Sequence, residues 1–326
     1  MYDFEVEKVL KWVRGSGAKF LLVQAPDGLK PYLSSLLEAL ERRGVTVVLS
    51  GEHSWGGCDL AFCEAKALGI KHILHVGHHG PVRFKISGFN ILFIPGYAEL
   101  HLDAKPLLSQ LKAMKARRVG LAASIQHLRS LEDVKKKLEE KGFEVKIGGG
   151  RFPGLVIGCD YSAAIAAEVD VYVVIAGGVF HALGLSFMTD RKVLAFDPYL
   201  GRVCSAEKLR RRVLARRLSD LSEAISAEKF FILVSIKPGQ NRFALALEVK
   251  RRLEKAGRRG LIIVLNEFSE EKLLNLGFCD AFVNTACPRL ITDNRDMFPR
   301  PVINPGELRY VLEGDLAEYD LRNVLL

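Results

Sequence analysis

Three cysteines lie in short motifs at wide intervals along the chain. Cys58 lies in SWGGCDLA and Cys159 in LVIGCDYS, so both stand between a glycine and an aspartate. Cys287 lies in NTACPRLITDN, directly before Pro288. Because proline has no N–H for a strand ladder, we expect Cys287 to be the last residue of a strand or the first of its loop.

Three cysteine thiolates suit two kinds of metal site. Zinc takes them with a fourth ligand, and an iron–sulfur cubane takes them with one iron left open for a substrate. The separations of 101 residues from Cys58 to Cys159 and 128 residues from Cys159 to Cys287 match no compact motif such as CxxC. Three ordinary buried cysteines remain an alternative, since free cysteine is among the most buried residue types. The other cysteines are interpreted as structural: Cys63, Cys204 and Cys279.

The elements that position these cysteines follow one order three times. A buried apolar strand is followed by a turn, a helix that ends at a glycine, and a second strand. The first strands are FLLVQ, RVGLAAS and FFILVSI, the glycines are Gly44, Gly142 and Gly257, and the second strands are VTVVLSG, FEVKIGG and RGLIIVL. A short helical segment then leads to HILHVGHHG, VYVVIAGGV or AFVNTACPR, and a last strand lies in ILFIPGYAEL, VLAFDPYLG or PVINPGELRY.

Strands that alternate with helices at this spacing predict right-handed βαβ units and parallel sheets. The predicted fold class is therefore α/β, with three repeated α/β domains over residues 1–113, 114–223 and 224–326. In such sheets the loops at the carboxyl ends of the strands carry the chemistry. We therefore expect one cysteine from each domain to meet the others at a pseudo-threefold centre.

The composition predicts a folded cytoplasmic protein. Among 326 residues 49% are hydrophobic, the mean hydropathy is +0.12, and no apolar run approaches the roughly 20 residues that span a bilayer. The first residues, MYDFEVEKVLKWVRGSG, have the pattern of an amphipathic helix and not of a signal peptide. Six cysteines are too few for a disulfide scaffold, so reduced thiols and a cytoplasmic location are expected.

The net charge of +9 and the pI of about 9.2 favour an acidic or nucleic-acid-associated partner. The densest basic run is LRRRVLARRL, residues 209–218. It is interpreted as a solvated helix face, with a docking surface for an RNA-bearing partner as the alternative. Aromatic residues do not interleave with these charges in the way that single-strand binding requires.

The motifs NTACPRLITDN, GGCDLA and IGCDYS, with a Pro-Asp-Gly turn after the first strand, resemble those of the archaeal diphthamide synthase family. The resemblance runs nearly end to end. It implies a 2-(3-amino-3-carboxypropyl)histidine synthase, a homodimer that holds a 4Fe-4S cluster on Cys58, Cys159 and Cys287. It also implies S-adenosylmethionine as co-substrate, a histidine of translation elongation factor 2 as acceptor, and an external electron donor. Neither a membrane nor direct contact with nucleic acid is required.

The resemblance implies radical chemistry without the compact CxxxCxxC loop of most radical S-adenosylmethionine enzymes, which this sequence lacks. One electron would enter the bond between the sulfonium sulfur and the γ-carbon. The products would be methylthioadenosine and a 3-amino-3-carboxypropyl radical that adds to carbon 2 of the imidazole. No acid–base pair stands out at a fixed spacing, so no catalytic residue is expected beyond the cluster ligands.

Loops at strand ends are the expected contacts to S-adenosylmethionine, because backbone N–H groups at a helix start favour anions and glycine permits close approach. The residues are Asp27 and Gly28 in the first turn, His78 and His79 in HVGHHG, Gly177, Gly178 and His181 in IAGGVFHALG, and Arg289 after the last cysteine. For each, the alternative is a purely structural loop position. Arg289 either pairs with the substrate carboxylate or forms a structural ion pair.

Two other functions remain open from the sequence. A quinolinate synthase also has three α/β repeats around a three-cysteine cluster, where the open iron acts as a Lewis acid and no S-adenosylmethionine is consumed. A non-catalytic three-domain protein that binds a ligand or RNA would have inert cysteines. The iron content and colour of the anaerobic protein distinguish the last class from the two enzymes.

Overall fold

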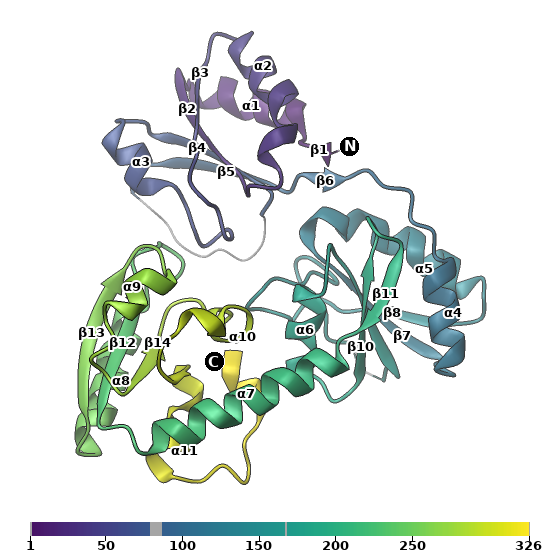
Figure 1. Cartoon of the computed structure of the whole chain (residues 1–326). Coiled ribbons are helices and arrows are strands. Elements are labelled where there is room, and N and C mark those ends of the chain that lie inside the picture. Colours follow the sequence, from purple (N-terminus) through teal and green to yellow (C-terminus); the bar gives the residue numbers. More distant parts are fainter. Residues whose placement is uncertain (1, 79–86, 167, 326) are drawn as a thin grey trace. The chain divides into compact units, whose positions relative to one another are not determined.

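The structure is a computed structural model that describes residues 2–78, 87–166 and 168–325 (Figure 1). Helices alternate with strands along the chain, and the strands form three separate sheets besides a two-stranded ribbon. The helices are α1 Val6–Ser16, α2 Ser34–Glu41, α3 Phe62–Ala67, α4 Lys105–Ala113, α5 Leu131–Glu139, α6 Phe180–Phe187, α7 Glu207–Ile225, α8 Phe243–Lys255, α9 Glu270–Leu274, α10 Leu290–Asp293 and α11 Leu308–Glu313. The ribbon pairs β1 Tyr2–Asp3 with β6 Tyr97–Ala98 in antiparallel fashion.

The three sheets share one strand order. The first sheet is β3 Thr46–Leu49, β2 Phe20–Gln24, β4 His72–Val76 and β5 Asn90–Ile94. The second is β8 Glu144–Ile147, β7 Arg118–Ala123, β9 Val171–Ile175, β10 Lys192–Asp197 and an extra edge strand, β11 Arg202–Ser205. The third is β13 Arg259–Leu265, β12 Lys229–Ser235, β14 Ala281–Asn284 and β15 Val302–Ile303.

In each sheet the first strand along the chain lies between the second and the third. It pairs in parallel with both: β2 with β3 and β4, β7 with β8 and β9, and β12 with β13 and β14. Between the first and third strands the chain's direction of winding reverses, which is where ligands bind in open parallel sheets. The predicted α/β class with repeated parallel sheets is confirmed.

The chain divides into two compact units. One comprises residues 1–157, 162–178 and 195–204, and the other residues 158–161, 179–194 and 205–326. Cys58 therefore belongs to the first unit, and Cys159 and Cys287 belong to the second. The division into three domains and the pseudo-threefold centre remain predictions.

The glycines at Gly44, Gly142 and Gly257 end the three repeated helices in the same way. All three have the left-handed backbone conformation, with φ of 76°, 86° and 75°. In each case the N–H after the glycine donates to the carbonyl five residues earlier: Val45 to Leu40, Phe143 to Leu138 and Arg258 to Leu253. This is the Schellman arrangement, which needs a residue without Cβ strain at that position. The repeated helix ends are thus confirmed.

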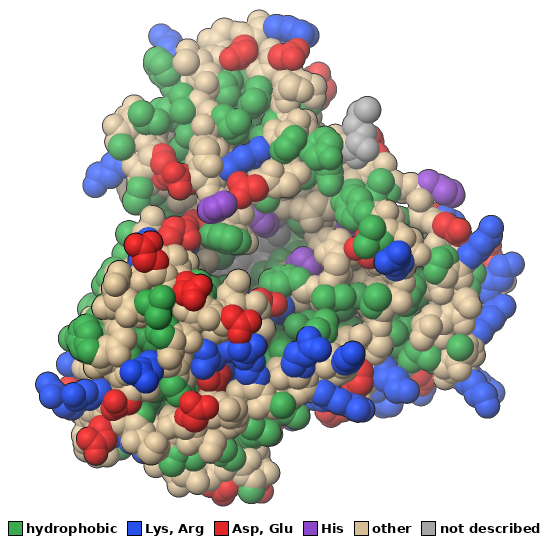
Figure 2. Space-filling model, in the orientation of Figure 1, with side chains coloured by type: hydrophobic (Ala, Val, Ile, Leu, Met, Phe, Trp, Pro, Cys, Tyr) green, Lys and Arg blue, Asp and Glu red, His purple; other side chains and the backbone are tan. Residues whose placement is uncertain are grey.

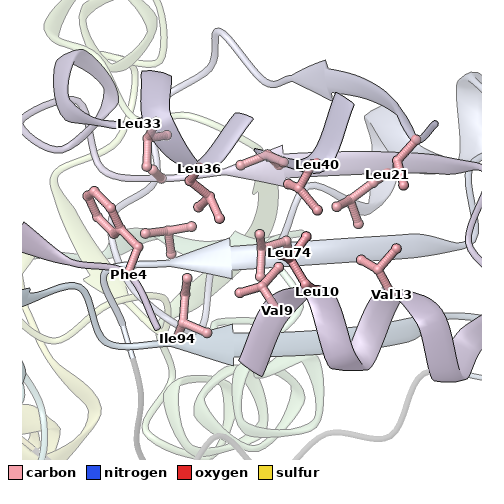
Figure 3. Close-up of a cluster of buried hydrophobic side chains, with 14 of the residues drawn as sticks. Phe4, Val9, Leu10, Val13, Leu21, Leu33, Leu36, Leu40, Leu74 and Ile94 are labelled. Carbon is pink, nitrogen blue, oxygen red and sulfur yellow. The ribbon is translucent and has the colours of Figure 1, made fainter. Parts of the chain in front are cut away.

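Apolar side chains cover both faces of the first sheet, which is why FLLVQ has no alternation of polar residues. Leu21 and Val23 face α1 and α2, whereas Leu22 packs with Ile73 and Ala65 on the opposite face. Figure 3 shows the first of these clusters, in which side chains of α1, α2 and the strands point toward one another: Phe4, Val9, Leu10, Val13, Leu21, Leu33, Leu36, Leu40, Leu74 and Ile94. The amphipathic helix expected at the start of the chain is α1.

Two local expectations were wrong. In the second repeat the segment before β9 forms turns, with no helix among its described residues. The strand before Cys287 ends at Asn284, so the cysteine lies within the loop. The Asn284 side chain ends the strand, because its amide accepts from the Ala286 N–H at 3.1 Å and donates to the Cys287 carbonyl at 2.9 Å.

The basic run 209–218 lies in α7, but one of its arginines is not solvated. Arg217 is 1% exposed and bonds Glu307, Asp220 and the Val302 carbonyl. The sequence could not show that Arg217 differs from the exposed arginines of this run, because Glu307 is 90 residues away along the chain. Across the described ranges of the chain, no helix is both long and apolar enough to cross a membrane.

Candidate metal centre

The three candidate ligands lie on loops beyond the carboxyl ends of strands. Cys58 follows β3, Cys159 follows β8 and Cys287 follows β14. Cys58 and Cys287 are half-buried and Cys159 is exposed. All six cysteines are described by the structure, and all keep their thiols without forming a disulfide. Three thiols on strand-end loops fit the donor set that an iron–sulfur cluster needs.

Within residues 2–78, 87–166 and 168–325, no three His, Cys, Asp or Glu side chains lie together as a set that could hold a metal ion. Cys58 belongs to one unit and the other two cysteines to the other. The three-cysteine ligand set therefore remains a proposal. What the structure describes is how each cysteine loop is held within its own unit.

Gln24, the last residue of β2, holds the loop that carries Cys58. Its amide nitrogen donates to the Asp59 carbonyl at 2.7 Å, and its amide oxygen accepts from the Ala61 N–H at 3.0 Å. The Asp59 carboxylate in turn accepts from the Trp55 N–H at 3.2 Å. The backbone on both sides of Cys58 is thereby fixed to the carboxyl end of the central strand of the sheet.

The same glutamine fixes the tautomers of two histidines, His75 in β4 and His78 just after it. The oxygen of Gln24 lies 3.1 Å from Nδ1 of His75, so that nitrogen must carry the proton. Nε2 of the neutral His75 then accepts from Nδ1 of His78 at 2.9 Å. His78 is left with a lone pair on Nε2. Both tautomers are thus assigned from the hydrogen bonds, which run from Gln24 to His75 and from His75 to His78.

Burial keeps this pair neutral. It lowers the pKa of His75 well below the ordinary value, with a further contribution from His78, and it lowers the pKa of His78 to about 4. The neighbouring Gly77 carbonyl accepts from the Gln126 side chain at 2.5 Å, which anchors the loop after β4. His78 is thus a fixed hydrogen-bond acceptor at the end of a strand next to the switch in winding. His79, the other histidine of this motif, lies outside the described residues.

Arg289 is anchored inside the second unit. It is 3% exposed, and it forms a bidentate pair with Asp293, with Nε–Oδ2 at 2.7 Å and Nη2–Oδ1 at 2.9 Å. Nη2 also donates to the Phe180 carbonyl at 2.9 Å, and the guanidinium lies 3.9 Å from the centre of the Phe180 ring. The structural ion pair, which the sequence left as one of two alternatives, is present. A contact to the substrate remains a prediction.

The first βα turn is occupied by side-chain interactions. Asp27 accepts from Lys30 at 2.7 Å and pairs with His53, and these bonds hold its pKa below the ordinary value. Lys30 also donates to the carbonyls of Gly51 and Glu52. The N–H groups of residues 29 and 30 both donate to the Pro26 carbonyl. Those two N–H groups are therefore engaged within the turn, and a ligand at Asp27 and Gly28 remains a prediction.

The GGV loop after β9 is held by Asp197. Gly178 has φ of 71° and donates its N–H to the Asp197 carboxylate at 2.8 Å. Gly177 lies close to the Tyr199 ring: a Cβ placed on Gly177 would stand 3.4 Å from the nearest ring carbon. His181 is half-buried in the first turn of α6, and it belongs to the other unit from the two glycines. Their role in binding remains a prediction.

The remaining cysteines differ from one another. Cys279 is 3% exposed and burial raises the pKa of its thiol to about 11, which fits a structural residue. Cys63 and Cys204 are exposed, so packing does not account for them, and Cys204 lies in β11 just before α7. Three further residues were not predicted as site residues: Gln24, His75 and Tyr161, whose hydroxyl accepts from Arg289 at 2.8 Å. Only Tyr161 had a signal in the sequence, its place two residues after Cys159.

A family model described as a putative diphthamide synthesis protein matches residues 25–321. The chain is 34% identical over 333 residues to the 2-(3-amino-3-carboxypropyl)histidine synthase of Pyrococcus horikoshii, covering 100% of this chain and 94% of that relative. It is 26% identical over 320 residues to subunit 1 of the same synthase of Homo sapiens, covering 95% of this chain and 72% of that relative.

The fold matches a solved structure. The crystal structure of Dph2 from Pyrococcus horikoshii with a 4Fe-4S cluster superposes with a TM-score of 0.86 at 33% identity, covering 99% of this chain and 95% of that chain. These matches favour neither a quinolinate synthase nor a non-catalytic module, because the relatives are named as 2-(3-amino-3-carboxypropyl)histidine synthases. With the family model matching most of its length, the chain belongs to the diphthamide synthesis family.

Proposed function

We propose that the protein is a 2-(3-amino-3-carboxypropyl)histidine synthase that catalyses the first step of diphthamide biosynthesis. It transfers the 3-amino-3-carboxypropyl group of S-adenosylmethionine to a histidine of translation elongation factor 2. One observation carries the proposal: a cysteine follows a strand in each of the three repeats, in a chain that resembles a crystal structure described with a 4Fe-4S cluster.

The cluster ligands in this proposal are Cys58, Cys159 and Cys287. Three thiolates leave one iron of a cubane open for substrate. When bound and reduced, the cluster supplies the single electron that breaks the bond between the sulfonium sulfur and the γ-carbon. The chain's own task is to hold the cysteine loops and to orient S-adenosylmethionine, so that this bond and not another faces the donor.

His78 is the best supported of the proposed contacts to S-adenosylmethionine. Its Nε2 lone pair is fixed by the bonds from Gln24 through His75, and its low pKa keeps the ring neutral. Such a nitrogen accepts a hydrogen bond from an ammonium or hydroxyl group, and S-adenosylmethionine has both. The other proposed contacts are Asp27, Gly28, His79, Gly177, Gly178, His181 and Arg289.

The remaining parts of the proposal come from the family. We propose a homodimer in the cytoplasm that receives electrons from an external donor and needs neither a membrane nor nucleic acid. The protein substrate is elongation factor 2, since the family serves diphthamide synthesis.

The test uses protein that has been reconstituted anaerobically with iron and sulfide and then reduced with dithionite. Incubation with S-adenosylmethionine and elongation factor 2 should release 5′-methylthioadenosine and add a 3-amino-3-carboxypropyl group to one histidine, as seen by peptide mass spectrometry. A reaction without dithionite is the control and should yield neither product. Release of 5′-deoxyadenosine as the main nucleoside, with the histidine unmodified, would contradict the proposal.

A further inference from the structure

Two of the candidate ligand loops are joined directly inside the second unit. Nη1 of Arg289 donates to the hydroxyl of Tyr161 at 2.8 Å. Tyr161 is two residues after Cys159, and Arg289 is two residues after Cys287. A single side-chain hydrogen bond therefore spans from the loop after β8 to the loop after β14.

Both ends of this bond are rigid. The Tyr161 side chain is 3% exposed, and its hydroxyl donates to the Gly158 carbonyl at 3.1 Å while it accepts from Arg289. Asp293, the Phe180 carbonyl and the Phe180 ring hold the guanidinium from three other directions.

Two glycines leave room for the bond. A Cβ on Gly184 of α6 would stand 1.7 Å from the Tyr161 oxygen and 2.0 Å from Nη1 of Arg289. A Cβ on Gly158 would stand 3.0 Å from the Phe180 ring. Helix α6 thus approaches the Tyr161–Arg289 bond so closely that no side chain larger than hydrogen fits at residue 184.

The two cysteines lie close to this pair along the chain, each two residues before one of its partners. The hydrogen bond from the Asn284 side-chain amide to the Cys287 carbonyl fixes the second loop from its other side. The bond between Tyr161 and Arg289 is thus placed where it can set the distance between the two cysteine backbones.

We propose that Tyr161 and Arg289 are positioning residues, whose hydrogen bond holds the loops of Cys159 and Cys287 so that both thiols face one ligand. The ligand is the iron–sulfur cluster, so this inference rests on the proposed function. It assigns Arg289 to the support of the cluster ligands, where the sequence had left open a pair with the substrate carboxylate or a structural ion pair. Groups that orient metal ligands from behind typically change metal affinity by 10- to 100-fold when removed.

The first test needs no cluster. Iron-free, reduced protein is treated with dibromobimane, which links two thiols that lie close together, and the linked peptides are identified by mass spectrometry. The wild type should give a Cys159–Cys287 link. Tyr161→Phe, which removes only the hydroxyl, should lower the rate of this link by roughly tenfold, because small misplacements of reacting groups are costly. Gly184→Ala, which displaces the bond without removing either partner, should lower it at least as much.

The matched control is Tyr310→Phe. Tyr310 is 4% exposed in the same unit, and its hydroxyl also accepts from an arginine, Arg309, at 2.6 Å. Both variants lose a buried hydroxyl bonded to a guanidinium, so urea unfolding should register a loss of stability in each. Only Tyr161→Phe should slow the thiol link. Equal linking rates in all proteins, equal slowing in both variants, or no link in the wild type would each overturn the proposal.

The second test uses reconstituted protein. Tyr161→Phe should lose iron to a chelator roughly tenfold faster than the wild type and should change the electron paramagnetic resonance spectrum of the reduced cluster. Tyr310→Phe should match the wild type in both, and an unchanged Tyr161→Phe would count against the proposal. If the wild type takes up no iron but the thiol links behave as expected, the proposed function fails and the positioning role stands.

Discussion

His127 is a buried titratable group without a hydrogen-bonding partner for one of its nitrogens. The side chain is 1% exposed, its ring packs edge-on against Tyr199, and its Nδ1 has no hydrogen-bond partner among the described residues. Burial lowers the pKa of His127 to about 4, although Asp197 acts in the opposite direction. The native protein therefore keeps this ring neutral at pH values where an unfolded chain would protonate it.

The stability of the protein should consequently fall as the pH is lowered from about 6.5 to about 4. In this window the unfolded state binds a proton at His127 and the native state does not, so proton uptake favours unfolding. The contribution of His127 is on the order of 3 kcal/mol, at 1.4 kcal/mol for each pKa unit. Urea unfolding at several pH values should show that His127→Phe makes the slope smaller, while His75 and His78, whose pKa values are also lowered by burial, keep the rest of it. His101→Asn, at an exposed position, should keep the full slope, and equal slopes in all three proteins would disprove the assignment.

The cysteines provide a sharper test of the proposed ligand set. Replacing any one of Cys58, Cys159 and Cys287 by Ala should abolish stable binding of iron after anaerobic reconstitution, because a cubane held by two thiolates has lost a third of its anchors. The controls are Cys63→Ala, Cys204→Ala and Cys279→Ala, which should keep the iron content of the wild type. Full iron content in a variant of the first group would show that its cysteine is not a ligand.

Single residues also mark how far the sequence could predict the site. The cysteines were predicted as ligands because two of their motifs share Gly-Cys-Asp and proline follows the third, and this ligand set stays a prediction. Gln24 and Tyr161 act through partners that are 35 to 51 and 128 residues away, and no local pattern indicates such contacts. Asp293 lies at i+4 from Arg289, a spacing typical of a helical ion pair, so it was in principle predictable.

Among the helices, α7 shows how a run of like charges can divide into different roles. Arg217 faces inward and is paired with Asp220 and Glu307, which are 2% and 0% exposed. Arg211 faces outward, with 76% of its side chain exposed and a single i,i+4 pair to Glu207. Periodicity alone predicted the helix but not which arginine is buried, since that depends on the acidic partner supplied by the segment after β15.

Removal of the buried charge should therefore lower the free energy of unfolding strongly, whereas removal of the exposed charge should hardly change it. Arg217→Met leaves Glu307 buried with no cation, and breaking such a pair costs about 3–5 kcal/mol. Arg211→Met should change the free energy of unfolding by less than about 0.5 kcal/mol. Urea unfolding at neutral pH measures both values. If Arg217→Met unfolds at the same urea concentration as Arg211→Met, the network around Glu307 does not stabilise the fold.

Over the entire chain, the threefold recurrence of strand, helix and glycine was enough to predict the class and the parallel sheets, but the strand order was not predicted. Each repeat builds the same sheet because the same apolar strands and helix-ending glycines recur, and local chemistry decides these features. The fifth strand of the second sheet and the turns around Cys159 were missed, because neither has a counterpart in the other repeats. The division of the chain into compact units depends on long-range packing, which periodicity does not encode.

Basic side chains gather on the molecule over the first part of α7 (Figure 2). Within this helix, Arg211 and Arg212 are exposed. Exposed charges of one sign attract an oppositely charged partner over about one Debye length, which is roughly 30 Å at 0.01 M salt and 3 Å at 1 M. With a net charge of +9, the protein favours an acidic partner, and we expect α7 to face the elongation factor.

Reversal of both charges, Arg211→Glu with Arg212→Glu, should weaken binding of elongation factor 2 by roughly tenfold at low salt, and the difference should shrink as salt is added, because screening removes the long-range attraction. The matched control is Arg251→Glu with Arg252→Glu, an equal charge change on α8. Surface plasmon resonance over a salt series measures the affinities, and iron content should be unchanged in both variants. If the two variants bind equally well at every salt concentration, the basic face of α7 is only a solvated surface and the partner docks elsewhere.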